Sequence, residues 1–393
     1  MTKKNWFKFL VDVFKTSLSS FGGPEAHYAV FIRKMAKEYH YVKEEEIKEW
    51  MGVFSLIPGP SSTQTMMAIG YSYGGPVLAF FTWIVWALPA MTILSFIAFL
   101  YPVIVDDTLW RRGLTYLPVL AIAFIAYAAI FLTQKVFKQQ ENFVVYGVVL
   151  LLAYLFQDLT FWVLPLLLVV TGIFVISRHR EHWMHEKRGQ KIKIPVIPIV
   201  IFVMFTIMIE GLRFLLMDPL WTTWFSFYRF GYSIIGGGQL VVPYMIETLF
   251  LGESSISLNV FLSGYSIDQA IPGPLFSFAS FVGAFVANET IFTALGSGFV
   301  SGFMIFLPGI LGVYIIFPVW KELRKRMIFQ FFIQGVVIAV SALISLTAIT
   351  QVVTLTLSLD VYMVFGISLL LLLNKKTNPI VLVLGVLLLG FIV

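Results

Sequence analysis

Hydrophobic residues fill runs of more than 20 positions along the chain, and polar residues are confined to narrow stretches between or within these runs. The runs 76–101, 195–217 and 327–349 are each longer than the roughly 20 residues that a membrane-spanning helix needs. The alternating pattern of a membrane β-barrel is absent. The pattern therefore predicts an all-α polytopic membrane protein.

Composition supports this class and excludes an ordinary soluble domain. Hydrophobic residues make up 59% of the chain and charged residues only 12%, whereas charged residues form about 25% of a typical soluble domain. The absence of cysteine excludes disulfide bonds, thiolate catalysis and cysteine-ligated metal. The net charge of +6 is better explained by basic cytoplasmic loops than by nucleic acid. Asp12 and Lys15 interrupt the apolar N-terminal stretch, so we expect no signal peptide.

One tetrapeptide occurs twice in similar apolar surroundings. Ile-Pro-Gly-Pro at residues 57–60 returns at residues 271–274, a displacement of 272 − 58 = 214. The same displacement carries Gly-Gly-Pro at 22–24 onto Gly-Gly-Gly at 236–238. Two homologous halves are therefore predicted, as in transporters whose sites lie where broken helices of two repeats meet. The predicted units are a first repeat, a linking transmembrane helix and a second repeat, over residues 1–190, 191–218 and 219–393.

A narrow polar stripe marks the first predicted helix, over residues 6–21. Its polar side chains recur at helical spacing: Lys8, Asp12, Lys15 and Ser19. Shifted by the displacement between the repeats, the stripe becomes Thr222, Ser226, Arg229 and Ser233. The only position of the stripe that is a cation in both repeats is that of Lys15 and Arg229. An interfacial helix whose cation reaches the lipid headgroups is the alternative. Because the stripe is thin and ends at a glycine break, we expect it to face the protein interior.

The second apolar segment, residues 51–73, is interrupted by its Pro-Gly-Pro. Proline and glycine stop a helix and free backbone groups, which a membrane tolerates only where they are buried in protein or line a cavity. Ser61-Ser62-Thr63-Gln64 suits the next helix start, with hydroxyls able to cap free N–H groups. Further helices are predicted over 76–105, 113–133, 143–157, 160–177 and 195–217, and the second half repeats the order.

Lysine and arginine are distributed differently in the two halves. Positions 33, 34, 37, 43 and 48 are basic, whereas the matching residues 247–262 contain neither type. Because cytoplasmic loops are enriched in lysine and arginine, we expect repeats of inverted topology, with Lys43 inside and Ser255 outside. Asp106 and Asp107 are then external, so one of the two apolar segments before them must enter and return. We predict that the Pro-Gly-Pro segment is re-entrant and that the linking helix inverts the second repeat.

Helix breaks of this kind supply N-terminal dipoles, each equivalent to roughly half a positive charge, and these attract anions. Together with Lys15 and Arg229 they could balance a dianion, although any single break could equally be a packing kink. The candidate substrate-binding residues are Lys15, Gly22, Gly23, Gly59, Ser61, Ser62, Gln64, Arg229, Gly236, Gly237 and Gly273.

Titratable residues near the breaks are candidates for proton coupling, because intramembrane ionisable groups are usually functional. They are Glu25, His27 and Asp268. Other charges have structural interpretations: Glu210 is expected to pair with Arg213, and Asp12 to neutralise Lys8 or Lys15. His179, His182 and His185 have a spacing that could hold a metal, but they lie in a basic loop, so we expect no metal site.

The same stretches carry a family resemblance. Residues 20–27, Pro58-Gly59-Pro60 with Gln64 and residues 69–71, Leu88-Pro89, and the second set at 236–238 and 272–274 resemble the chromate ion transporter family in its two-domain form. The resemblance implies a multi-pass protein of a bacterial or archaeal inner membrane that exports chromate, an oxyanion similar to sulfate, coupled to protons. Ile234-Ile235 departs from the Thr-Phe or Ser-Phe pair expected before the second glycines.

Other functional classes fit the sequence less well. An intramembrane enzyme would need a nucleophile, metal or acid/base pair that this chain hardly offers. An anion channel, or a transporter of another small anion, would use similar breaks and stays an alternative, whereas an assembly protein would not require symmetric ones. The expected partners are a small inorganic oxyanion, protons and the lipid bilayer, with no nucleic acid and no cofactor, and a homodimer is compatible with the chain.

Overall fold

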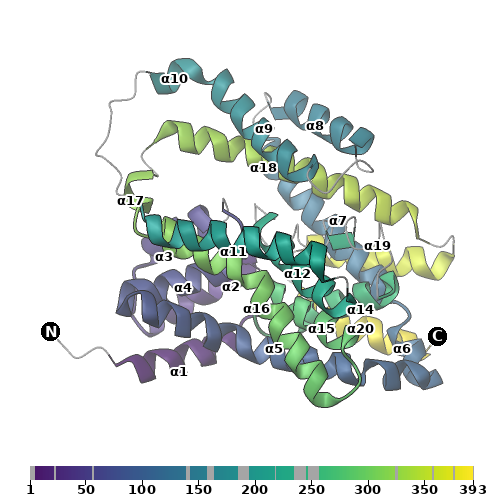
Figure 1. Ribbon diagram of the computed structural model, residues 1–393. Helices are drawn as coiled ribbons and strands as arrows, with labels where there is room; N and C mark the ends of the chain where they lie inside the picture. Colours follow the sequence, from purple (N-terminus) through teal and green to yellow (C-terminus); the bar gives the residue numbers. More distant parts are fainter. Residues whose placement is uncertain are drawn as a thin grey trace.

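The computed structural model is built of helices (Figure 1), and the part of the chain that it describes contains no strand. It describes residues 5–21, 24–54, 57–138, 142–156, 163–184, 194–216, 218–233, 245–246, 256–323, 326–355, 358–374 and 377–392. Five of the helices described there are long and apolar enough to cross a membrane. The predicted all-α polytopic membrane architecture is confirmed.

The first repeat contains α1 (Trp6–Ser17), α2 (Pro24–Phe31), the π-helical η1 (Ile32–Glu38), α3 (Glu44–Phe54), α4 (Ser61–Gly74), α5 (Pro76–Asp106), α6 (Thr108–Leu114), α7 (Leu117–Val136), α8 (Asn142–Phe156), α9 (Val163–Arg178) and α10 (Arg180–Met184). The linking helix is α11 (Val196–Leu215). The second repeat contains α12 (Pro219–Ser233), α14 (Leu258–Ala270), η3 (Leu275–Ser277), α15 (Phe278–Val286), α16 (Ile291–Ile316), α17 (Trp320–Leu323), α18 (Met327–Val353), α19 (Leu359–Leu373) and α20 (Pro379–Ile392).

The helix boundaries follow local chemistry. Helix α4 is terminated by Gly75, which has a φ of 86°. Pro76 occupies the first position of α5, where a backbone N–H would have no partner within the helix, so proline loses no hydrogen bond there. The Pro-Gly-Pro of the first repeat separates α3 from α4, and that of the second repeat separates α14 from η3. The predicted breaks and the predicted linking helix are therefore present.

Corresponding helices of the two repeats pack in corresponding ways. The pairs related by the displacement of 214 residues are α1 and α12, α3 and α14, α5 and α16, α7 and α18, α8 and α19, and α9 and α20. Thus α1 packs on α5 as α12 packs on α16, and α7 packs on α19 as α18 packs on α8. The repeats are joined where α7 packs on α18 and where α5 packs on α16.

One pair of corresponding helices departs from this symmetry. Helix α14 packs on α7 and α20, and Ser266 of α14 donates its hydroxyl to the carbonyl oxygen of Leu117 at 2.7 Å. Within the described residues, its counterpart α3 makes no comparable contact with α18 or α9. A Cβ placed on Gly52, the counterpart of Ser266, would meet nothing within 4 Å.

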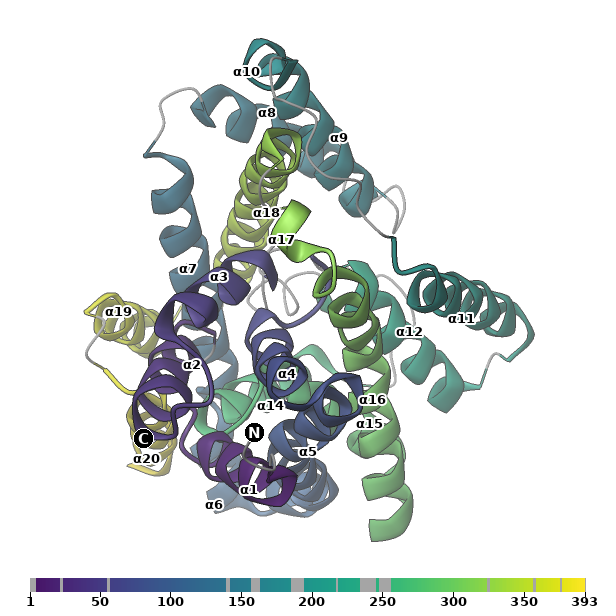
Figure 2. The ribbon, with the colours of Figure 1, turned by 90° about the vertical axis from the view of Figure 1, so that its left-hand side faces the viewer.

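In both ribbon views α8, α9 and α18 lie above α1 to α5 (Figures 1 and 2).

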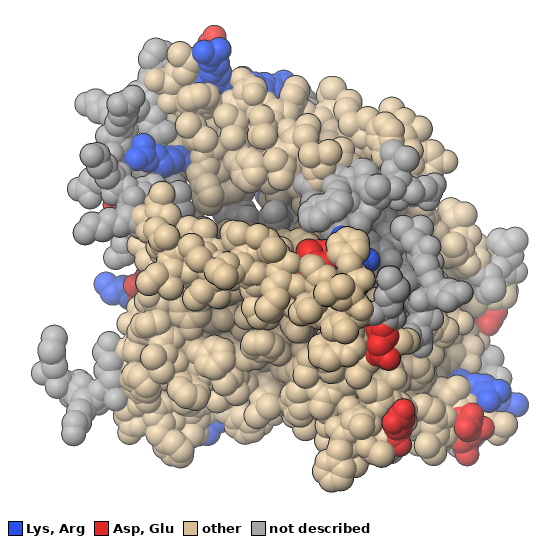
Figure 3. All heavy atoms as spheres, viewed as in Figure 1, with Lys and Arg blue, Asp and Glu red and all other residues tan. Residues whose placement is uncertain are grey.

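Charged side chains are distributed unevenly on the surface. On the face shown in Figure 3, lysine and arginine side chains gather at the upper left over α10, and most of the visible acidic side chains lie at the lower right, around the end of α5 and α6. Most of the remaining surface is uncharged, as expected for helices that face lipid.

Candidate functional site

The two Pro-Gly-Pro loops each lie against the long helix of the other repeat. Gly59 has a φ of 111° and Gly273 a φ of 136°, values that side chains rarely permit. A Cβ on Gly59 would lie 2.7 Å from Cα of Gly309 in α16, and a Cβ on Gly273 would lie 2.6 Å from Cβ of Ala90 in α5. Gly309 and Ala90 each follow a proline inside their helix. The contact is therefore reciprocal, and both loops require glycine for conformation and for space.

A backbone hydrogen bond connects the second loop with the first helix break. The N–H of Gly273 donates to the carbonyl oxygen of Ser20 at 2.8 Å, and Ser20 lies between α1 and α2, two residues before Gly22. The glycines of both breaks, Gly22, Gly23, Gly236 and Gly237, lie outside the described residues. The structure thus brings the first break and the second Pro-Gly-Pro loop together.

The start of α4 is buried and polar. Residues 61–65, Ser-Ser-Thr-Gln-Thr, are each at most 2% exposed. The N-cap position is Pro60, which makes no side-chain cap, and the hydroxyls of Ser61 and Ser62 have no partner among the described residues. The predicted capping by these hydroxyls is therefore wrong, because a proline occupies the position from which a side chain would cap. The first N–H groups of α4 remain without a side-chain partner in the described structure.

Gln64 fixes this helix start against the second repeat. Its Nε2 donates to the carbonyl oxygen of Pro58 at 2.7 Å and to that of Gly309 at 3.2 Å. Its Oε1 is buried and has no hydrogen-bond partner in the structure. Both donor hydrogens of the amide are thus used to hold the loop, and the amide oxygen is left free.

The second repeat has an apolar sequence at the same place. Leu275, Phe276, Ser277 and Phe278 correspond to residues 61–64 and are all buried. Pro274 is the N-cap of η3 and makes no side-chain cap. Only the first repeat therefore presents a hydroxyl-rich helix start, and the candidate site is one-sided although the backbone is repeated.

Trp86 of α5 connects α1, α2 and α4 around this site. Its carbonyl oxygen accepts from the Ser17 hydroxyl at 2.7 Å, and its indole N–H donates to Oγ1 of Thr63 at 3.2 Å. His27, fully buried, meets the indole edge-to-face with ring centroids 5.5 Å apart. Sequence reasoning did not select Ser17, Thr63 or Trp86. Thr63 could have been found from its place in the helix start, whereas nothing in the local pattern marks Trp86.

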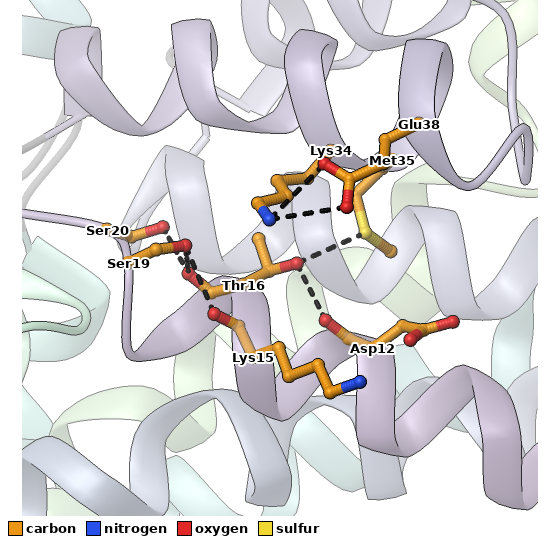
Figure 4. A network of polar contacts seen from close by, with 8 residues as sticks. All are labelled: Asp12, Lys15, Thr16, Ser19, Ser20, Lys34, Met35 and Glu38. Atoms are coloured by element: carbon orange, nitrogen blue, oxygen red, sulfur yellow. Dashed lines mark hydrogen bonds and ion pairs between the residues drawn. The ribbon is translucent and has the colours of Figure 1, made fainter.

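The polar stripe of α1 does not face the interior as one unit. The buried face comprises Phe9, Asp12, Val13, Thr16 and Ser17. Lys8 and Lys15 are exposed, so the prediction of an interior stripe is wrong for its two cations. Small hydroxyl residues can be buried because their hydroxyls donate to backbone carbonyl oxygens of their own helix. The Thr16 hydroxyl donates to the carbonyl oxygen of Asp12 at 2.7 Å. The hydroxyls of Ser19 and Ser20 both donate to the carbonyl oxygen of Thr16 (Figure 4).

Asp12 has a partner that the sequence did not predict. Its Oδ2 accepts from the Tyr41 hydroxyl at 2.7 Å, and it forms no ion pair with Lys8 or Lys15 in the described structure. The predicted neutralisation of those lysines is therefore wrong. A buried carboxylate on α1 is satisfied by a phenol that lies just before α3, which no helical spacing could reveal.

Arg229 is buried on α12 and is engaged by the linking helix. Its Nε lies 3.1 Å from Oε1 of Glu210, and the same carboxylate accepts from the Tyr232 hydroxyl at 2.7 Å. Arg213 lies 4.0 Å from the other oxygen of Glu210. The predicted Glu210–Arg213 pair is present as the longer of two contacts. Contact of Arg229 and Lys15 with an anion stays a prediction.

The coupling candidates differ in their surroundings. Asp268 lies in the last turn of α14, is 5% exposed, and its Oδ2 has no hydrogen-bond partner. The ring nitrogens of His27 also lack a hydrogen bond of normal geometry, although the Ser20 backbone lies near the ring. The side chain of Glu25 is outside the described structure. His179 and His182 both contact the ring of Phe331, and His185 is outside the described residues.

Comparison with known proteins agrees with this duplicated architecture. The chromate transporter family model matches residues 7–177 and again residues 221–391. The chain belongs to the chromate transporter family. The two matches are displaced by 221 − 7 = 214 and 391 − 177 = 214, the displacement that the tetrapeptide gives. The chain is thus the two-repeat form of the family, as its motifs indicate.

Curated relatives cover most of the chain at low identity. An uncharacterized transporter of Methanocaldococcus jannaschii is 24% identical over 96% of this chain and 92% of its own length. Chromate transport proteins of Cupriavidus metallidurans and Pseudomonas aeruginosa are each 22% identical, over 81% and 96% of this chain and 76% and 90% of their own lengths. No solved structure matches the chain.

Proposed function

We propose that this chain exports chromate, or a sulfate-like tetrahedral oxyanion, across the inner membrane in exchange for protons. Relatives named as chromate transport proteins support the substrate class. The observation that carries the proposal is the start of α4, a buried and uncapped helix N-terminus lined by hydroxyls and held against α16 by Gln64.

This helix start has the chemistry of an anion site. The free N–H groups of a helix N-terminus and its dipole favour negative charge. The hydroxyls of Ser61 and Ser62 add donors that rotate to suit an oxyanion, and neither is committed to another described residue. Such a site recognises tetrahedral shape and charge, so sulfate is expected to compete with chromate.

The membrane potential favours export. An inside-negative potential of 100 mV is worth about 2.3 kcal/mol per charge, hence about 4.6 kcal/mol for a dianion leaving the cell. Proton entry would add to this driving force. A passive pathway would therefore already expel the anion, and coupling would let the protein work against a steeper gradient.

The unequal packing of α3 and α14 supports movement by alternating access. In this arrangement α14 is packed on α7 and α20, whereas α3, among the described residues, makes no comparable contact with α18 or α9. With the orientation that the charge bias predicts, the less tightly packed helix α3 lies on the cytoplasmic side, where an exported anion enters. The opposite state would exchange the two packings, as repeats of inverted topology allow.

Counterflow in proteoliposomes tests the proposal. Vesicles loaded with unlabelled chromate should accumulate labelled chromate transiently, because an exchanger moves one anion against another whereas an enzyme does not. The double change Ser61→Ala and Ser62→Ala should weaken the apparent affinity about tenfold or more, on the scale of 1.5–3 kcal/mol for a hydrogen bond to a charged group. Ser368→Ala, at a buried serine of α19, is the matched control. Equal counterflow by the double variant and the parent protein would remove the α4 start as the anion site.

A further inference from the structure

Asp268 is a buried carboxyl group for which the described structure provides no counter-ion. The residue is 5% exposed, and its Oδ2 makes no hydrogen bond. Its backbone carbonyl oxygen accepts from the N–H of Ile271, the C-cap residue of α14, at 3.1 Å. No lysine or arginine occurs in the sequence from Phe230 to Trp320. A carboxylate in such a place must be paired, hydrated or protonated, because burying an isolated charge is strongly unfavourable.

The elements packed around α14 provide no compensating charge in their described parts. They are α7, α15, α20, α5 and η3. Helices α15 and α20 and the η3 turn contain no titratable residue. On α7 the titratable residues are Tyr127 and Lys135, and the Lys135 ammonium lies 4.1 Å from the centre of the Phe131 ring. On α5 they are Tyr101 and the exposed Asp106. Tyr265, one turn earlier on α14 itself, is the remaining neighbour with a titratable group.

We propose that Asp268 carries the proton that is exchanged for the anion. This inference rests on the proposed function and names its coupling residue. In the observed packing the carboxyl holds a proton, since the group is only 5% exposed and the described residues around it include no cation that would stabilise the carboxylate. Separation of α14 from α7 admits water, and the proton then passes from the carboxyl oxygen to that water and leaves a carboxylate.

The position of Asp268 connects protonation with the candidate anion site. Ser266, two residues earlier, makes the bond to Leu117 that attaches α14 to α7. Gly273, five residues later, bonds to Ser20 at the first helix break. The counterpart of Asp268 in the first repeat is Phe54. The glutamates of α3 lie nearer its start, at Glu44, Glu45, Glu46 and Glu49, so only α14 carries an acid at this buried last-turn position. A proton there biases one packing and not the other, as coupling requires.

The test compares two measurements on the purified, reconstituted protein. A pH gradient in which the external side of the protein is more acidic than its cytoplasmic side should drive chromate accumulation on the external side by the parent protein. A trapped pH dye reports the accompanying proton movement. Asp268→Asn, neutral at every pH, should lose gradient-driven accumulation and anion-dependent proton movement while still exchanging labelled for unlabelled chromate. Asp268→Glu should keep both. Asp106→Asn, at an exposed acid, should behave as the parent.

The outcomes separate this inference from the proposed function. Failure of the parent protein to show counterflow would remove the proposed function itself. A parent that couples, together with an Asp268→Asn variant that accumulates chromate as well as the parent, would assign coupling to His27 or Glu25 instead. Loss of counterflow as well as coupling in Asp268→Asn would also overturn the inference, because the residue would then serve anion passage or folding.

Discussion

The contact between Glu210 and Arg229 is the charged attachment of the linking helix to the second repeat, beside a 2.8 Å hydrogen bond between the hydroxyls of Thr206 and Tyr228. Helix α11 is otherwise largely exposed, and Arg229 is one of the few buried cations in the described structure. Arg229→Gln leaves Glu210 without its nearest cation. Breaking a buried pair typically costs about 3–5 kcal/mol. We expect a clear fall in the melting temperature of the detergent-solubilised protein, measured by the intrinsic fluorescence of its tryptophans.

The double variant Glu210→Gln with Arg229→Gln separates stability from transport. Removing both charges should restore most of the stability, because replacing a whole buried pair is often nearly neutral. If the restored protein also transports chromate normally, the predicted contact between Arg229 and the anion is excluded. If it is stable and inactive, that contact is supported.

The two loop glycines should respond differently to the same substitution. Gly273→Ala adds a methyl group against the Ala90 side chain, and Gly59→Ala adds one against the backbone of Gly309. Ala90→Gly should therefore rescue part of the loss caused by Gly273→Ala. The remaining part, roughly 1–2 kcal/mol, reflects the unfavourable φ. Chromate counterflow and thermal stability should both show this rescue.

Shortening a side chain cannot fully rescue Gly59→Ala, because its nearest obstacle is the Cα atom of Gly309 at 2.7 Å, with Nε2 of Gln64 next at 2.9 Å. A Gly59→Ala variant with parental stability and counterflow would show that the two loops do not need the close approach seen here. The two variants thus test the reciprocal contact from both sides.

Residue-scale prediction failed where partners lie far apart in sequence. The thin stripe on α1 correctly marked an amphipathic helix, but helical spacing could not tell which polar residues would be buried. Asp12 is buried because Tyr41 reaches it, and Thr16 because its hydroxyl bonds to its own helix. Lys15 has no such arrangement and is exposed. Burial of a polar side chain depends on its tertiary partner, which periodicity does not contain.

Element-scale prediction succeeded where covalent chemistry decides the structure. Two prolines flanking a glycine interrupt a helix, so both Pro-Gly-Pro breaks could be predicted from sequence, whereas the single Pro308-Gly309 pair stays within α16. The long helix α5 and the linking helix α11 followed from the length of their apolar runs. The sequence did not predict that each loop contacts the helix of the other repeat, because that contact depends on how the repeats are joined.

The orientation of the elements can be tested directly. A topology reporter placed at Lys43, between η1 and α3, should be cytoplasmic, and one at Ser255, outside the described residues and shortly before α14, should be external. The reason is the absence of lysine and arginine from the second of these connections. Reporters on the same side would contradict inverted repeats, and with them the proposed exchange of α3 and α14. A reporter at the basic residues 321–326 is the internal control and should be cytoplasmic.

At the scale of the whole molecule, the proposed transport requires one sequence to adopt two packings. The repeats share a backbone plan, so α3 could pack on α18 and α9 as α14 packs on α7 and α20. The repeat pattern alone does not show which packing is populated, because it relates the two helices without fixing their tertiary contacts. The structure shows one of the two, with Ser266 bonded to Leu117 and open space beside Gly52.

Because the chain has no cysteine, spin labels can report both packings without background. Glu45 on α3 and Val170 on α9 are exposed, and the displacement of 214 residues carries them onto Asn259 on α14 and Leu384 on α20, which are also exposed. In the absence of anion we expect the 259–384 distance to be short and the 45–170 distance to be long. Under turnover with chromate and a pH gradient, each pair should gain a second population, with the order of the two distances reversed.

A label pair within one packed unit provides the control for this measurement. Val170 and Ile349 lie on α9 and α18, which pack together, and their distance should keep a single population throughout. The two symmetric pairs should also change together, because a helix that leaves one surface is exchanged for its counterpart on the other. One unchanging population in both symmetric pairs under turnover would contradict alternating access between these helices, and passage through a fixed pore would then account better for the observed asymmetry.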